Sequence, residues 1–487
     1  MTETLREKTI NGVLWSAIQR YGNQVITLVI SIVLARLLEP RQFGLVGMLA
    51  VFVGISQTFI DSGLGTALIQ KKKTTDEDFS TVFYFNLLVS IVFYFALFFT
   101  SPLIADFYGE PKLDQLTKVL GLLLIINAFG IIHNTKIQKS LEFKKIAKVT
   151  FISSILSGTI AIIFALNNFG VWSLVIYQLS IKLFKTIFLW IYDSWKPSLK
   201  FSIEAFKELF NYSSKLLASS LLYRITDNIY YVIIGKFYSP ASLGFYDRAV
   251  KFQMLAARNL NATIQVVTFP VLSEIQDDSQ RLHNSYKKIL EMISFVIFPL
   301  MILLIVTAKP IILILIGEKW SQSIIYLQLL SVLGIGYPIA SINLNILKVK
   351  GRSDLFLRLE IIKSALLIIL LIITAKFGII AIILGQYLLE VFSFYINTYY
   401  SGSFINLGPS KQLKLMLPYA SISIIVALVT VSLKFLFFNN YILLLSQVAL
   451  YITLYLVMTK LFKLNSFNEF IDILKSYIKK LKRGKLQ

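Results

Sequence analysis

The sequence predicts an all-α, polytopic membrane protein of about 14 transmembrane helices. From about Thr9 to Phe462 the chain consists of membrane-length apolar runs joined by short hinges. Composition agrees, because 56% of the 487 residues are hydrophobic and the mean hydropathy is +0.71. Those values exceed what soluble folds normally show. No stretch remains for an independently folded soluble domain, so a soluble enzyme is excluded.

Apolar runs punctuated by Gly, Pro, Asn and charged residues define the predicted spans. Lys and Arg concentrate in the even-numbered hinges and are scarce in the odd-numbered ones. Because short cytoplasmic loops retain basic residues, we expect both termini to lie in the cytoplasm. The fourteen predicted spans cover residues 9–37, 42–69, 79–104, 113–134, 146–166, 170–192, 208–236, 242–270, 288–308, 322–347, 354–374, 378–400, 412–436 and 440–462.

The formal charge of +22 does not indicate nucleic acid binding, because the basic residues are scattered over short hinges and a tail. Membrane topology and anionic lipid explain most of them. The chain has no Cys and only 2 His, so thiolate and histidine metal sites are not expected. It also lacks the GxxxxGK[ST] phosphate-binding loop, and we expect no nucleotide or other cofactor.

Two sequence echoes indicate an internal repeat. "LARLLEPRQFGLVG" in the first half matches "IGKFYSPASLGFYD" in the second, and "NNFGVWSLVIYQL" matches "AKFGIIAIILGQYL". Pro and Gly are common in short turns, which is the alternative explanation for each match alone. However, both matches join spans of equal rank. They pair Pro40 with Pro240, Gly44 with Gly244, Gly170 with Gly378, and Gln178 with Gln386.

The echoes predict two six-helix lobes related by a pseudo-twofold axis, followed by an extra helix pair. The lobes are expected at residues 1–200 and 201–405, and the helix pair at 406–462. Residues 463–487 form a basic amphipathic tail, which we expect to lie on the anionic cytoplasmic leaflet.

Several segments carry a family resemblance. They include "LARLLEPRQFGLVGM", "FIDSGLGTALIQKK", "NNFGVWSLV", "ITDNIYYVIIGKFYSPASLGFYDRA" and "VTFPVLSEIQDDSQRLHNSYKKIL", in order over the first 290 or so residues. "KVKGRSD" and "AKFGIIAIILGQ" continue the likeness. In these segments the chain resembles the Wzx-type polysaccharide or oligosaccharide flippases of the multidrug/oligosaccharidyl-lipid/polysaccharide exporter superfamily. It is most similar to colanic acid and teichuronic acid exporters.

The resemblance implies two helical bundles around a cavity that opens alternately to the cytoplasm and the periplasm of a bacterial inner membrane. The implied substrate is an undecaprenyl-diphosphate-linked oligosaccharide, which a flippase moves to the periplasmic leaflet for export of a surface polysaccharide. Such a protein is a transporter and not an enzyme. Buried arginines suit a diphosphate because the planar guanidinium donates two parallel hydrogen bonds.

Charged residues near mid-membrane are functional candidates by default, since each charge there is costly. Arg20 lies in the first span, and Arg224 and Asp227 lie in the seventh, which is its equivalent in the second lobe. We expect Arg20 and Arg224 to bind diphosphate, with Asp227 orienting Arg224 or taking part in ion coupling. The alternative is an Arg224–Asp227 pair on the helix surface that neutralises itself.

The eighth span holds Arg248, Lys251 and Arg258, which helical geometry allows to face one broad cavity. Arg248 and Lys251 lie nearer the periplasmic end, and the alternative for them is that their heads reach the interface. Arg258 is farther from either end and is the stronger candidate for the cavity.

Three carboxylates are candidates for ion coupling or gating: Asp61, Asp227 and Glu390. Asp61 precedes Gly63 and Gly65, so its alternative role is in a helix-breaking turn. Glu390 occupies the lobe position that corresponds to Lys182. Coupling to H⁺ or Na⁺ through one of these carboxylates would reset the empty carrier.

Two other functions remain open at this point. A drug exporter of the same superfamily should show an acidic cavity, whereas Arg outnumbers carboxylate at mid-depth here. A lipid-linked sugar polymerase or ligase usually needs a large periplasmic loop, which the predicted hinges do not provide. The expected partners are membrane lipids and a polysaccharide polymerase complex, and the expected oligomeric state is a monomer.

Overall fold

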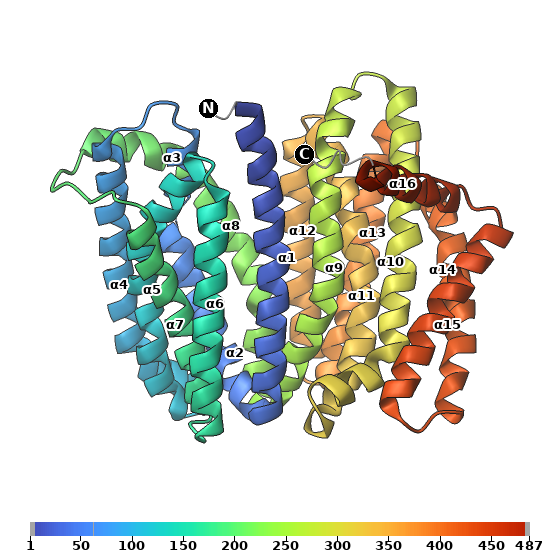
Figure 1. Ribbon diagram of the computed structural model, residues 1–487, viewed down its shortest axis with the longest axis horizontal. Helices are drawn as coiled ribbons and strands as arrows, with labels where there is room; N and C mark the ends of the chain where they lie inside the picture. The colour runs from blue at the N-terminus through green and yellow to red at the C-terminus, as the bar shows by residue number, and fades with distance from the viewer. Residues whose placement is uncertain (1–4, 62, 483–487) are drawn as a thin grey trace. The chain divides into compact units, whose positions relative to one another are not determined.

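The protein is almost entirely helical over the residues that the computed structural model describes, 5–61 and 63–482 (Figure 1). Within that range the side chains of 5–10, 212, 215, 258–260, 262–263, 266–267, 473–474 and 477–482 are not described. The helices are α1 (Leu5–Leu37), α2 (Pro40–Asp61), α3 (Leu64–Gln70), α4 (Asp76–Tyr108), α5 (Lys112–Lys139), α6 (Phe143–Leu166), α7 (Val171–Tyr192), α8 (Ile203–Phe237), α9 (Pro240–Glu274), α10 (Ser279–Leu315), α11 (Gln322–Val349), α12 (Ser353–Thr374), α13 (Ile379–Ile405), α14 (Pro409–Val431), α15 (Asn440–Leu461) and α16 (Asn465–Lys482), with short 3₁₀ turns at Glu318–Trp320 and Ser432–Phe435.

The all-α membrane fold that the sequence predicts is confirmed, and each predicted span except the second coincides with one long helix. In the described residues, eleven helices are long and apolar enough to cross a membrane. Among the helices at predicted spans, α8, α9 and α12 lie outside that set, and each carries several ionisable side chains. The second predicted span is interrupted, because α2 ends at Asp61 and the chain turns at Gly63, whose φ of 74° favours glycine.

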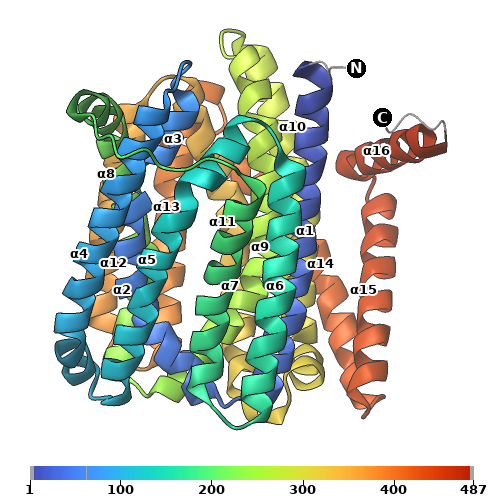
Figure 2. The same ribbon diagram turned by 60° about the vertical axis from the view of Figure 1, so that its left-hand side comes forward.

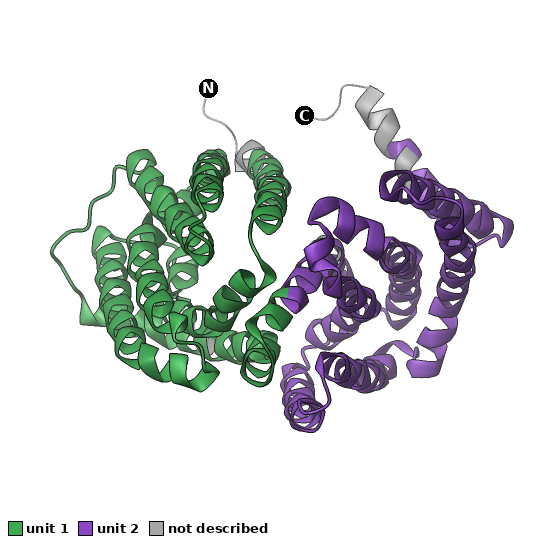
Figure 3. Ribbon diagram, turned by 90° about the horizontal axis from the view of Figure 1, so that it is seen from below, with its two compact units in different colours: residues 1–244 green, residues 245–487 purple. Residues whose placement is uncertain are grey.

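The chain divides into two compact units, residues 1–244 and 245–487, coloured green and purple in Figure 3. The sequence repeat assigns α8 to the second lobe, yet α8 packs against α2, α3 and α4 within the first unit. Its counterpart in the repeat, α1, packs on α6 instead. Two helices that are equivalent by sequence therefore have different neighbours.

Small residues bring helices of the first unit close together, as membrane helix packing requires. A Cβ atom built on Gly158 of α6 would lie 2.3 Å from Ile30 Cδ1 of α1. Next to this contact, the Ser154 hydroxyl donates a hydrogen bond of 2.6 Å to Asn23 Oδ1. Helix α7 packs on both α5 and α6, and Figure 2 shows it between them.

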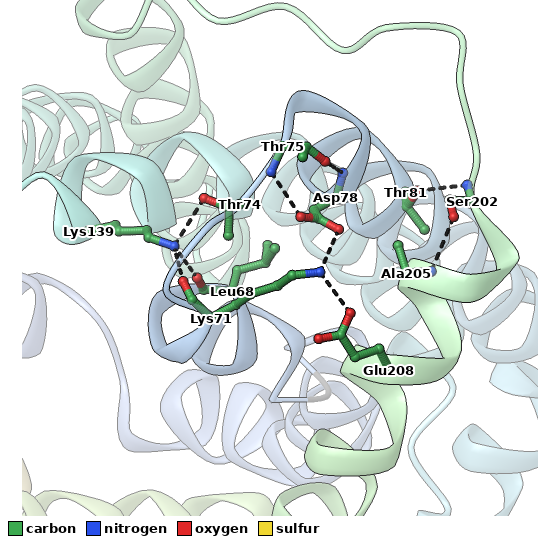
Figure 4. A network of polar contacts seen from close by, with 10 residues as sticks. All are labelled: Leu68, Lys71, Thr74, Thr75, Asp78, Thr81, Lys139, Ser202, Ala205 and Glu208. Carbon is green, nitrogen blue, oxygen red and sulfur yellow. Dashed lines mark hydrogen bonds and ion pairs between the residues drawn. The ribbon is translucent and has the colours of Figure 1, made fainter.

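A network of polar contacts joins α3, α4, α5 and α8 (Figure 4). Lys139 Nζ donates to the carbonyl oxygens of Leu68 and Lys71 at 2.7 and 2.6 Å, which satisfies acceptors at the end of α3. Lys71 forms ion pairs with Asp78 at 3.1 Å and Glu208 at 2.8 Å. The Glu208 carboxylate raises the pKa of Lys71, so this ammonium stays charged at neutral pH.

The segment between α7 and α8 is attached to α4 and α5 along its length. His133 Nδ1 lies 2.9 Å from Asp193 Oδ2 at the beginning of the segment. Farther along, the Ser198 amide donates to Ser80 Oγ at 2.9 Å and the Ser202 amide donates to Thr81 Oγ1 at 3.0 Å. These contacts fix where α8 begins.

In the second unit, α10 packs against α11, α13, α14 and α15. A buried amide network joins three of these helices: Gln412 Nε2 donates to Asn343 Oδ1 at 3.0 Å, and Tyr286 donates to Gln412 Oε1 at 3.1 Å. Helix α16 lies across the end of α15 (Figures 1 and 2). Its first turns are held by a 2.7 Å Tyr419–Ser466 hydrogen bond and a 2.9 Å Lys288–Glu469 ion pair.

The first sequence echo forms a reciprocal contact within residues 1–244. A Cβ atom on Gly44 would lie 1.6 Å from the carbonyl oxygen of Pro240, and one on Gly244 would lie 2.0 Å from that of Pro40. The two matched Pro–Gly motifs therefore pack backbone against backbone, each glycine facing the other motif's proline. Such isologous pairing is what a twofold relation produces.

We expect Gly44→Ala and Gly244→Ala each to destabilise the protein by at least about 1–3 kcal/mol, because the added methyl meets backbone that cannot rotate away. Gly408→Ala is the matched control, since its φ is −70° and a Cβ there meets nothing within 4 Å. Thermal unfolding of the purified variants measures the effect. Equal midpoints for Gly44→Ala and Gly408→Ala would contradict the close contact.

Candidate functional site

A cluster of polar and charged side chains lies within the first unit, where α2, α5 and α7 meet. Lys182 Nζ of α7 donates a hydrogen bond of 2.8 Å to Asn127 Oδ1 of α5. The amide nitrogen of Asn127 donates in turn to Asp61 Oδ1 of α2 at 3.4 Å. Asn127 thus bridges a cation and a carboxylate on two different helices.

Two further cations lie within electrostatic range of Asp61: Lys185, one turn beyond Lys182 on α7, and Arg224 of α8. The stem of Arg224 lies beside Gly54 of α2, where a Cβ atom would be 3.8 Å from Arg224 Cδ. Asp61 and Arg224 are exposed, and the two lysines are half-buried. The cluster therefore combines three cations with the Asp61 carboxylate, and it stays net positive even when Asp227, three residues after Arg224 on α8, is counted with it.

The structure separates Arg224 from the partner considered in the sequence. Among the described side chains, no hydrogen bond or ion pair joins Arg224 to Asp227, so the two do not form a self-neutralising pair. Arg20 is exposed on α1, and its neighbours Gln19 and Asn23 face α6 through Thr150 and Ser154. The side chain of Arg258 lies outside the described residues.

In the second unit, Arg248 and Lys251 share a carboxylate that the sequence interpretation missed. Asp247 Oδ2 accepts from Arg248 Nη2 at 2.8 Å and pairs with Lys251 Nζ at 3.0 Å. The side chains of Asp247 and Arg248 are 6% and 4% exposed, whereas that of Lys251 is 57% exposed. Arg248 is thus a buried, paired cation, and Lys251 is the accessible member of this cluster.

Glu390 of α13 packs against the backbone of α11. A Cβ atom on Gly336 would lie 2.0 Å from Glu390 Oε1, so the glycine makes room for the carboxylate. Lys363 of α12 interacts electrostatically with Glu390 and forms an ion pair with Glu360. The Glu360–Lys363 pair is the local pairing expected of residues three apart on a helix.

The sequence interpretation did not find Asn127, Lys185, Asp247 or Gly336. Asp247 directly precedes Arg248, so a search for both signs of charge on one helix would have identified it. Asn127 has no such signal, because its partners lie 66 and 55 residues away in the chain. In the described residues, no group of three or more His, Asp and Glu side chains could hold a metal ion.

Replacing Asp247 with Asn should destabilise the protein by about 3–5 kcal/mol, because it leaves the buried Arg248 guanidinium without its carboxylate. Lys251→Gln should have a much smaller effect, since that ammonium is more than half exposed. Thermal unfolding in one detergent compares the two variants. A similar decrease in the unfolding temperature of both variants would indicate that the buried Arg248 guanidinium is not stabilised mainly by Asp247.

Comparisons with known proteins match this architecture. The chain is 29% identical to the lipopolysaccharide biosynthesis protein WzxC of Escherichia coli (strain K12), over 81% of this chain and 80% of that protein. It is 26% identical to the teichuronic acid biosynthesis protein TuaB of Bacillus subtilis (strain 168), over 72% and 73% of the two chains. Among solved structures, the lipid II flippase MurJ in an inward closed conformation superposes with a TM-score of 0.76 at 17% identity, covering 94% of this chain and 100% of that one. A family model described as "Polysaccharide biosynthesis protein" matches residues 33–325, and the chain belongs to this polysaccharide biosynthesis family.

Proposed function

We propose that this protein is a flippase that moves undecaprenyl-diphosphate-linked oligosaccharide units from the cytoplasmic to the periplasmic leaflet of a bacterial inner membrane. The observation that carries the proposal is the excess of cations over carboxylates on membrane helices of the first unit, in a chain of the polysaccharide biosynthesis family. A charged side chain on a membrane helix is costly, and binding of an anionic ligand is a function that accounts for its presence.

The parts of such a substrate require different surroundings. The diphosphate needs cationic donors, the sugars need water and hydrogen-bonding groups, and the polyprenyl chain can remain in lipid. Arg224, Lys182 and Lys185 supply donors from α7 and α8, and Arg20 and Lys251 supply exposed cations on α1 and α9. In this proposal the headgroup crosses the membrane through alternating access, without covalent chemistry.

Affinity for the headgroup must be moderate, because a site that holds diphosphate too tightly prevents its release. Movement of H⁺ or Na⁺ would reset the empty carrier, with Asp61, Asp227 and Glu390 as candidate carboxylates. The basic hinges place both termini in the cytoplasm in this proposal. A polysaccharide polymerase is the expected recipient of the flipped unit.

Replacing Arg224 with Ala should lower translocation of a lipid-linked glycan in vesicles by about tenfold or more, since a hydrogen bond to a charged group contributes about 1.5–3 kcal/mol. Arg258→Ala tests the arginine on α9 in the same assay. Arg224→Lys should restore activity only in part, because Lys cannot donate two parallel hydrogen bonds.

The matched control is Arg41→Ala, which removes an exposed arginine in the first turn of α2 that pairs with Glu110 at 2.7 Å. Its transport rate should equal that of the unmodified protein. Unchanged transport in both Arg224→Ala and Arg258→Ala, at equal expression, would remove these arginines from the mechanism. Export of cationic drugs with no glycan movement would instead favour the drug-exporter function.

A further inference from the structure

The charge cluster of the first unit is unbalanced. Three cations, Lys182, Lys185 and Arg224, lie within electrostatic range of the Asp61 carboxylate, and Asp227 follows Arg224 by three residues on α8, so the cations outnumber these two carboxylates. Such an arrangement on membrane helices is expensive unless further negative charge is supplied at least part of the time. The imbalance therefore indicates a site for an anion beside Asp61.

Hydrogen bonding shows which donors remain available. Lys182 donates to Asn127 at 2.8 Å. Neither Lys185 nor the Arg224 guanidinium forms a hydrogen bond or ion pair with another described residue. An ammonium has three donors and a guanidinium has five, so each of these side chains has donors available for ligand oxygen atoms.

Asp61 occupies an unfavourable position for a carboxylate. It is the last residue of α2, where the negative end of the helix dipole disfavours a carboxylate. Its hydrogen bond from Asn127 is long, at 3.4 Å. The chain turns at Gly63, two residues later, and α3 begins directly after it as a separate helix. The nearby cations compensate for an otherwise unfavourable position.

We propose that the Asp61 carboxylate occupies the phosphate-binding position when no substrate is bound. The carboxylate and a phosphate oxygen compete for the same donors on Lys182, Lys185 and Arg224. An arriving diphosphate displaces Asp61, and the return of Asp61 to the cations expels the headgroup afterwards. The site's preference for a diphosphate rests on the proposed function, whereas competition between Asp61 and an anion does not.

This mechanism separates binding from release. A carboxylate that is tethered within the site acts as an internal competitor at high effective concentration. It weakens headgroup binding and speeds dissociation, which satisfies the need for moderate affinity. Removing the charge of Asp61 should therefore strengthen anion binding and slow turnover, which is the opposite of what loss of a cation produces.

The test measures binding of inorganic pyrophosphate to the purified full-length chain by calorimetry. Asp61→Asn should lower the dissociation constant about fivefold or more, because it removes the competing charge and keeps the side-chain shape. Lys185→Gln and Lys182→Gln should raise it by a similar factor. Matched controls are Asp114→Asn and Lys118→Gln, a 2.9 Å ion pair on α5, which should bind pyrophosphate like the unmodified protein.

Transport provides the second measurement. In vesicles, Asp61→Asn should lower both the maximal rate and the apparent KM for a lipid-linked glycan, since release slows while binding tightens. Pyrophosphate affinity that is unchanged or weaker in a folded Asp61→Asn variant overturns the inference. If affinity changes as expected but no glycan is moved by the unmodified protein, the proposed function fails and the competing-anion site stands.

Discussion

The cost of an uncompensated charge in a low-dielectric membrane governs which polar residues this fold can carry. Each charged side chain on a spanning helix needs a counter-charge, a polar partner or access to water. Arg248 meets the requirement through Asp247, and Lys182 meets it through Asn127. Lys185 and Arg224 are exceptions, because among the described residues they have no such partner. Their donors remain available to a ligand.

The same constraint applies to the backbone. Peptide groups in lipid must be satisfied within helices, so departures from helical geometry are confined to special residues. The break between α2 and α3 occurs at Gly63, and Lys139 supplies donors to the carbonyl groups at the end of α3. Close approach of helices depends on small side chains, as at Gly44, Gly158 and Gly244.

Much of the fold was accessible from the sequence because apolar runs of membrane length leave few alternatives. Every predicted span has a helix, and the echo that paired Gly44 with Gly244 marks two motifs in contact. The packing of α8 could not be predicted in this way, since the repeat shows equivalence and not neighbours. The break after Asp61 was anticipated only as an alternative, from the glycines that follow it.

The candidate site was predictable only in part. The cations Arg224 and Lys251 stand out in sequence because charge is rare in apolar spans. Their partners do not, because contacts such as Asn127 with Asp61 join distant segments and depend on how helices rotate about their axes. A neutral amide in a membrane helix carries no pattern that distinguishes a bridging role from simple packing.

The attachment of the segment before α8 has a mechanical consequence. Asp193, Ser198 and Ser202 each form a hydrogen bond with α4 or α5, so this connection is anchored at three positions. If the beginning of α8 moves, α4 must move with it or these hydrogen bonds must break. The connection is therefore short and anchored, and it transmits a tilt of α8 to α4 and α5.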